Sequence, residues 1–284
     1  MIMITNILIR LIVFFWVIHM LYTTVPKDKR WFAIGLFIFI LYLSRLLLSV
    51  LADNCNQLDI YTFSSDIPGP TMVAVAGSHG NEPGGTVGLY SLIHDLQQKK
   101  ENVKQGTLII IPELNRCGLK LGIRYLPQEL LSLNMMTSDL NRNYANTDKE
   151  EGRCNISKEV EQILTQADFV YDGHEGYDFT RLVPESMGSG IYPSVNEKAK
   201  QLSTHLTFAI NQSHLLRNKE DYKKFITRDA WSLIDGSLRK YCQTRNIPYI
   251  LVETTGQNDI QPLHVRGDQH YFLCKEMAKQ IGIL

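Results

Sequence analysis

Two long apolar runs dominate the beginning of the chain. Ile7 to Val25 and Trp31 to Leu51 are almost continuously hydrophobic over 19 and 21 residues. At about 1.5 Å per residue, each run matches a bilayer core of roughly 30 Å, so the pattern predicts two transmembrane helices, at about 7–25 and 31–51, joined as a membrane hairpin. A cleaved signal peptide is an alternative for the first run, but that run lacks a basic start and a small-residue cleavage site before Pro26. A hairpin buried in a protein core is the other alternative.

After these runs, short β-branched segments alternate with segments of helical periodicity. Residues 53–70 are polar and rich in turn residues, so we expect a second domain to begin near Leu58 and to extend to residue 284. The pattern predicts strands at 73–76, 107–111, 169–172 and 249–253, and helices ending at 97 and spanning 157–167, 195–212, 229–244 and about 263–281. This order predicts an α/β fold, with a mostly parallel mixed sheet and helices on both faces.

The N-terminal apolar part and the rest of the chain differ in net charge. The loop between the apolar runs, residues 26–30, is basic, so the positive-inside rule predicts a cytoplasmic loop. This predicts a multi-pass membrane protein, with the domain that begins near Leu58 on the non-cytoplasmic side. The net charge is zero overall, and residues 52–284 are mildly acidic. Because they carry no basic stripe, we expect no nucleic-acid partner. The five cysteines are scattered, so their redox state stays open.

Candidate chemistry begins directly after the strand at 73–76. His79 and Glu82 lie three residues apart in a glycine-rich turn that opens a helix. A neutral imidazole and a carboxylate on one turn can bind Zn²⁺, whose catalytic sites use three protein ligands and leave a position for water. His174, just past the predicted strand at 169–172, is the best third ligand. His-x-x-Glu alone is a weak motif, because about half or more of its matches arise by chance.

The positions of the strands strengthen this interpretation. His79, His174 and Glu253 each follow a predicted strand, and the carboxyl ends of parallel strands meet at one edge of a sheet. A long loop between the second and third predicted strands contributes further polar groups. These are Asn115-Arg116, Arg124 and the segment Ser138-Asp139-Leu140-Asn141-Arg142-Asn143-Tyr144.

With these residues the chain resembles the zinc carboxypeptidase superfamily, in its succinylglutamate desuccinylase/aspartoacylase-like branch. The resemblance covers residues 71 to about 255 and rests on four ordered motifs. They are His79-x-x-Glu82, Asp139-Leu140-Asn141-Arg142, Asp172-x-His174 and Glu253. It implies a zinc hydrolase with one Zn²⁺ per chain, held by His79, Glu82 and His174.

The resemblance also implies roles for the other residues. Asn141 and Arg142 would bind a substrate carboxylate, Arg124 would polarise the scissile carbonyl, and Glu253 would be the general base. Asp139 would orient a zinc-bound imidazole, or it is an exposed loop residue. Arg116 is the rival of Arg124.

Three other residues, Glu175, Tyr177 and Tyr192, are candidates for contacting the substrate or supporting the ligands. The segments Glu175 to Phe179 and Thr254 to Gln257 depart from those expected in aspartoacylase itself, which leaves N-acetylaspartate in doubt as the substrate.

Three functions from two classes therefore remain in view. The first is a membrane-anchored zinc-dependent amidohydrolase that cleaves an N-acyl amino acid or a similar small substrate with a free carboxylate. The second is a zinc carboxypeptidase that acts on peptides. The third is a membrane-anchored binding protein without catalysis, against which the complete set of His79, Glu82, His174 and Glu253 argues.

Overall fold

The sheet predicted from the sequence is the centre of the molecule. The computed structural model describes residues 15–130, 138–228 and 234–284, and within them seven strands form one mixed sheet in the order β1-β3-β2-β4-β7-β5-β6. The strands are β1 (Tyr61–Ser64), β2 (Thr71–Ala76), β3 (Thr107–Ile111), β4 (Phe169–Gly176), β5 (Gly190–Pro193), β6 (Ile226–Thr227) and β7 (Tyr249–Thr255). The inner strands β3, β2, β4 and β7 are parallel, whereas β1 pairs antiparallel with β3 and β5 antiparallel with β7.

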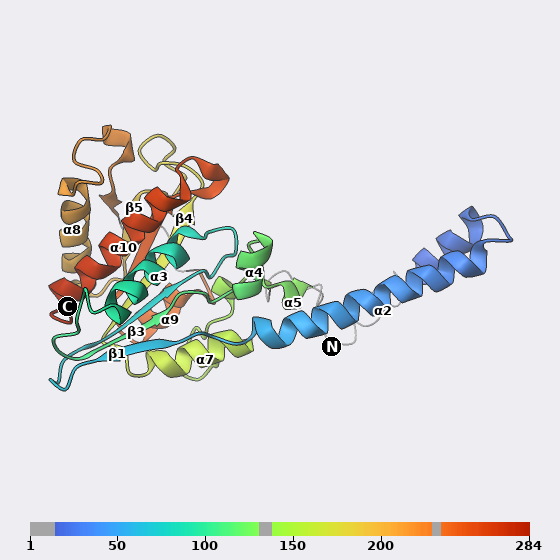
Figure 1. Cartoon of the computed structure of the whole chain (residues 1–284), viewed down its shortest axis with the longest axis horizontal. Coiled ribbons are helices and arrows are strands. Elements are labelled where there is room, and N and C mark those ends of the chain that lie inside the picture. The colour runs from blue at the N-terminus through green and yellow to red at the C-terminus, as the bar shows by residue number, and fades with distance from the viewer. Residues whose placement is uncertain (1–14, 131–137, 229–233) are drawn as a thin grey trace.

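Helices cover both faces of this sheet, as predicted (Figure 1). The helices α3 (Gly84–Gln97), α8 (Glu197–Gln212) and α10 (Leu263–Gln280) share one hydrophobic cluster with alternate residues of β2 (Met72, Ala74 and Ala76). The helices α7 (Asn155–Leu164) and α9 (Leu238–Thr244) share a second cluster with the intervening residues Val73 and Val75. The inner strands are thus buried on both faces, which explains their continuous apolar runs.

Short elements complete the described chain: α4 (Arg116–Leu121), α5 (Pro127–Leu130) and the 3-10 helices η1 (Leu140–Arg142), η2 (Asp221–Lys223) and η3 (Gln257–Asp259). These elements, and the short strands β1, β5 and β6, were not predicted. The helix predicted at 229–244 begins only at Leu238, because Gly236 has a φ of +76° and Ser237 caps α9 by accepting a hydrogen bond from Lys240 N. Residues 229–233 lie outside the described residues.

The membrane prediction is corrected by the structure. None of the helices among the described residues is long and apolar enough to cross a membrane. The described part of the first apolar run, residues 15–25, is helical at 15–24. Residues 7–14 of that run lie outside the described residues. The two-helix membrane hairpin, and the multi-pass location with the domain on the non-cytoplasmic side, are therefore wrong.

The helix of the second run leads into the part of the chain that contains the sheet. Helix α2 (Arg30–Cys55) projects from the sheet-containing part, and its last residue is buried (Figure 1). Cys55 forms a disulfide with Cys117 of α4, with 5.3 Å between the two Cα atoms. The sequence left the pairing of the cysteines open, because no spacing pattern identified it. The disulfide fixes the end of α2 beside the loop that leads to Arg124.

Candidate active site

The turn after β2 carries the first two proposed ligands. Strand β2 ends at Ala76, and Gly77 turns the chain with a φ of +71°, a conformation that favours glycine. His79 and Glu82 then precede α3, and both side chains are buried. The structure therefore contains the strand, turn and helix that the sequence predicted around this motif.

Glu82 lies between two imidazoles. Its Oε1 is 2.9 Å from Nδ1 of His79, and its Oε2 is 2.8 Å from Nδ1 of His174. His174 comes from β4, which continues to Gly176, so this residue lies within the strand and not just past it. The potential ligand atoms of the three residues all lie within 4.8 Å of one another. The predicted third ligand is thus brought to the first two.

The outer ring nitrogens of both histidines face carboxylates. Nε2 of His79 is 3.1 Å from Oδ1 of Asp139. Nε2 of His174 is 3.2 Å from Oδ1 of Asp172, close enough for an ion pair but not aligned as a hydrogen bond. Tyr249 donates a hydrogen bond of 2.7 Å to the other oxygen of Asp172. Carboxylates in these positions favour a proton on each Nε2 and leave each Nδ1 with a free lone pair.

This arrangement fits a bound cation. With both protons on Nε2, the two Nδ1 atoms and the oxygens of Glu82 are all acceptors that face one another at less than 3 Å. Burial alone would raise the pKa of Glu82, but the two imidazoles lower it well below its usual value. Burial would lower the pKa of His174, but Asp172 and Glu82 raise it well above its usual value. The cluster therefore favours positive charge at its centre, and two nitrogens with one carboxylate form a donor set that zinc accepts.

Glu253 lies beside this cluster. It is paired in register with His174 across β7 and β4, near the carboxyl ends of both strands. Its side chain lines a cavity of about 420 Å³ together with the three proposed ligands. Glu253 is 8% exposed, and its side chain has no hydrogen-bond partner among the described residues. Burial raises its pKa to about 8, with His174 acting in the opposite direction. A carboxylate of this kind is well suited to accept and return a proton.

Of the two candidate arginines, only Arg124 lies at the cavity. Arg124 lines the cavity, donates to Oδ2 of Asp139 from Nε and Nη2 at 3.2 and 3.1 Å, and reaches Glu82 at 3.4 Å. Its side chain is 32% exposed. Arg116 instead pairs with Glu113 and Asp59 and does not line the cavity. Asp139 is buried and contacts both His79 and Arg124, so it is not an exposed loop residue.

Asn141 and Arg142 also line the cavity. Oδ1 of Asn141 accepts a hydrogen bond of 2.9 Å from Leu238 N, which assigns the orientation of the amide, and the NH₂ group has no hydrogen-bond partner among the described residues. Arg142 donates from Nη1 to the carbonyl of Asn141 at 2.5 Å and has no acidic partner among the described residues. An available amide and a guanidinium without a carboxylate suit an anionic ligand.

The remaining sequence candidates differ in position. Tyr177 lines the cavity and is exposed. Tyr192 is buried and donates to the carbonyl of Met187, so it does not reach the cavity. Glu175 lines the cavity but forms an ion pair of 2.7 Å with Arg266. Burial raises the pKa of Glu175 to about 7, with Arg266 acting in the opposite direction.

Three contacts at this site were not predicted. Asp172 was part of a quoted motif but had no role, although its place two residues before His174 on a strand puts both side chains on one face. Tyr249 is four residues before Glu253 on β7, so the same period of two would have indicated it. Gln257 donates to Glu82 Oε1 at 3.0 Å, and no signal in the sequence indicates this contact.

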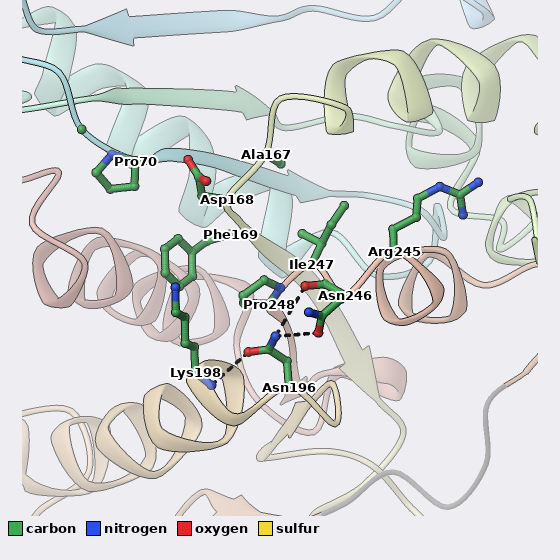
Figure 2. A pocket seen from close by; sticks show the side chains of 11 residues that line it. Pro70, Ala167, Asp168, Phe169, Asn196, Lys198, Arg245, Asn246, Ile247 and Pro248 are labelled. Atoms are coloured by element: carbon green, nitrogen blue, oxygen red, sulfur yellow. Dashed lines mark hydrogen bonds between the residues drawn. The ribbon is translucent and has the colours of Figure 1, made fainter. Parts of the chain in front are cut away.

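A second hollow, of about 630 Å³, lies at the opposite edge of the sheet, around the amino ends of β4 and β7 (Figure 2). Several of its polar groups are engaged with one another or with the backbone. Asn196 donates to Oδ1 of Asn246 at 2.9 Å, and Asp168 accepts from Thr71 N at 2.8 Å. None of the proposed catalytic residues lines it. The groups suited to catalysis are thus at the carboxyl edge of the sheet.

Three solved structures share this fold. Tripeptide-bound cell shape determinant Csd4 from Helicobacter pylori is 17% identical, with a TM-score of 0.63 over 80% of this chain and 56% of that chain. The mDAP-bound form of H. pylori Csd4, described as a D,L-carboxypeptidase, is 16% identical, with a TM-score of 0.61 over 79% and 55%. An aspartoacylase family protein from Mesorhizobium loti is 17% identical, with a TM-score of 0.55 over 80% and 62%. The chain spans less than two thirds of the length of each, and at these identities the likeness shows the fold alone.

The comparison with family models identifies the family of the chain. No curated protein matches the chain significantly. Residues 68–212, just over half of the chain, match the family described as succinylglutamate desuccinylase/aspartoacylase catalytic domain. This segment contains His79, Glu82, His174 and the loop from Arg124 to Arg142. The chain belongs to the succinylglutamate desuccinylase/aspartoacylase family.

Proposed function

We propose that residues 58–284 form a zinc-dependent hydrolase that cleaves an amide bond in a small substrate with a free carboxylate. The proposal rests on the position of Glu82 between the Nδ1 atoms of His79 and His174. An acidic side chain lies at the Nε2 atom of each histidine. When bound there, a zinc ion would polarise the scissile carbonyl and lower the pKa of water.

Glu253 moves the proton in the proposed reaction. Its carboxylate takes a proton from the attacking water as the oxygen–carbon bond forms. It returns this proton to the leaving nitrogen as the carbon–nitrogen bond breaks, which releases a carboxylic acid and an amine. Its place beside His174 in the register of β4 and β7, and its side chain on the cavity, support this role. Positive charge at the ligand set would favour its ionised form.

Arg124 supports the same step from the other side of the ligand set. Its guanidinium lines the cavity and is held by Asp139 and Glu82, so its charge is fixed before a substrate arrives. A held cation near a carbonyl stabilises the negative charge that develops on the oxygen during attack. Arg116 has no such position, because its partners are Glu113 and Asp59.

Asn141 and Arg142 define the substrate class. Arg142 has no acidic partner among the described residues, and Asn141 has an available NH₂ group on the same cavity. A planar guanidinium binds a carboxylate through two parallel hydrogen bonds, and the amide adds another donor. We therefore assign the substrate a free carboxylate near the scissile amide, as in an N-acyl amino acid.

A peptide substrate is the second candidate. A C-terminal carboxylate of a peptide presents the same group to Arg142 and Asn141. The structural neighbours favour this candidate, because Csd4 is described as a D,L-carboxypeptidase and its structures hold a tripeptide or mDAP.

One substrate panel tests the proposal and separates the two candidates. The zinc-loaded full-length protein is assayed for amine release from N-acyl amino acids and from peptides, each with a free or an amidated C-terminal carboxyl. We expect hydrolysis only of the free carboxylates, and the better of the two groups identifies the class. Equal cleavage of the amidated compounds would contradict the carboxylate assignment, and no hydrolysis of any compound would contradict the proposed activity.

A further inference from the structure

A buried ion pair lies next to Glu82, outside the set of proposed ligands. Glu175 and Arg266 are both buried, and Oε2 of Glu175 is 2.7 Å from Nη1 of Arg266. Arg266 belongs to α10, and no motif in the sequence indicated it. We propose that Glu175 and Arg266 are positioning residues that hold Glu82 in its ligand geometry. This inference rests on the proposed zinc site.

The pair joins the segments that carry the site. Oε1 of Glu175 accepts a hydrogen bond of 2.9 Å from Gly84 N, at the start of α3 and two residues after Glu82. Nη1 of Arg266 also donates to the carbonyl of Gly256 at 3.1 Å, just after β7, which carries Glu253. The turn after β2, the ends of β4 and β7, and α10 are therefore tied together at one point.

Two glycines make room for the pair. A Cβ at Gly84 would lie 2.1 Å from Oε1 of Glu175. A Cβ at Gly256 would lie 2.4 Å from Cδ of Arg266 and 2.6 Å from Cδ of Glu175. Real Cβ atoms do not approach other atoms so closely. The backbone at Gly84 and the backbone at Gly256 thus pack directly on the pair. A shift of either charged side chain would therefore move these two backbone segments.

The backbone of Glu175 reaches Glu82 itself. Its N–H donates to Oε2 of Glu82 at 3.2 Å. Its carbonyl accepts from Nε2 of Gln257 at 2.5 Å, and the same nitrogen donates to Oε1 of Glu82 at 3.0 Å. Both oxygens of Glu82 are thus oriented by groups that depend on the position of Glu175.

Stability alone does not account for this pair. A buried ion pair loses much hydration free energy, and replacing both partners by neutral side chains is often neutral or stabilising. Groups that orient metal ligands, in contrast, typically change metal affinity about 10- to 100-fold when they are altered. The two roles therefore predict different results for a double replacement.

The decisive variant is Glu175→Gln/Arg266→Met in the full-length chain. Glutamine keeps an acceptor for Gly84 N, and methionine fills the volume of the arginine stem without a charge. We expect the metal-free variant to keep a melting temperature close to that of the wild type, while its zinc dissociation constant rises about 10- to 100-fold. Zinc affinity is measured by competition with a chelator, and thermal unfolding is followed without metal. Wild-type zinc affinity in the folded double variant would overturn the inference.

A second variant decides the question if the double variant does not fold. Arg266→Lys keeps the positive charge beside Glu175 but loses the planar group that also reaches Gly256. We expect its zinc dissociation constant to rise about tenfold, and an unchanged value would overturn the inference. Lys275→Met is the matched control, because Lys275 lies on the same helix and pairs with Glu101 away from the site. It should bind zinc like the wild type.

The same measurements distinguish this inference from the proposed function. A wild-type protein that binds no zinc would overturn both. Zinc binding that is lost in His79→Ala, together with wild-type affinity in the folded Glu175 and Arg266 variants, would overturn the positioning role alone.

Discussion

Replacing Glu253 by glutamine separates proton transfer from metal binding. The two side chains have similar size, and the Glu253 side chain has no hydrogen-bond partner among the described residues, so the exchange removes no hydrogen bond within them. General acid–base groups typically contribute about 10²- to 10⁴-fold to the rate. We therefore expect kcat to fall by at least about 100-fold, while the zinc content stays at the wild-type value. The assay is steady-state hydrolysis of the best substrate, with metal analysis of the same preparation.

The pKa of Glu253 supplies an independent check on this variant. Burial raises the pKa from a usual value of 4.5 to about 8, so between these pH values the folded protein holds a proton that the unfolded chain has lost. The stability contributed by this proton is present below about pH 4.5 and is lost as the pH rises through about 8. The resulting loss in the free energy of unfolding is about 5 kcal/mol at most.

Metal-free Glu253→Gln should therefore have a higher free energy of unfolding than the metal-free wild type at pH 8, and no such advantage near pH 4.5. Urea unfolding with a chelator measures this difference. A variant that keeps wild-type kcat would refute the proposed role of Glu253. Glu175 could not then simply take over the role, because Arg266 and Gly84 N already engage its carboxylate. A variant that is less stable than the wild type at pH 8 would refute the electrostatic reasoning.

Three further predictions concern binding and stability. Arg142→Ala should raise KM on the order of tenfold for a substrate with a free carboxylate, which steady-state kinetics can check. Replacing Cys55 and Cys117 together by serine should lower the free energy of unfolding by about 4 kcal/mol, because the disulfide closes a loop with a sequence separation of 62, and denaturant titration measures this loss. Burial lowers the pKa of His270 to about 3, so stability should fall as the pH drops from about 6.5 toward 3, and unfolding titrations should show a shallower pH dependence in His270→Gln.

The sequence predicted the part of the site that depends on strand order. His79 follows β2, whereas His174 and Glu253 lie near the carboxyl ends of β4 and β7, and the parallel pairing of these strands brings the three residues to one edge of the sheet. Their short motifs also carried enough family information to place Asn141 and Arg142 on the same cavity. These predictions depend on local patterns and on a simple rule of sheet topology.

Contacts set by long side chains across distant segments were not predictable. Arg266 meets Glu175 across 91 positions, and Gln257 meets Glu82 across 175, with no periodicity to connect them. The short strands β5 and β6 have four and two residues, too few to show a pattern. The apolar composition of the N-terminal runs led to the wrong membrane prediction. The sequence shows how long the run 31–51 is, but it does not show that the helix of this run ends at a buried, disulfide-bonded residue, Cys55.

Metal analysis of the purified protein tests the central claim most directly. After zinc loading and removal of free metal, we expect about one zinc per wild-type chain and almost none in His79→Ala or His174→Ala. His205→Gln is the matched control, because His205 pairs with Glu276 away from the site, and it should keep the wild-type zinc content. Stoichiometric zinc that persists in both ligand variants, or a wild-type chain that binds none, would contradict the proposed metal centre.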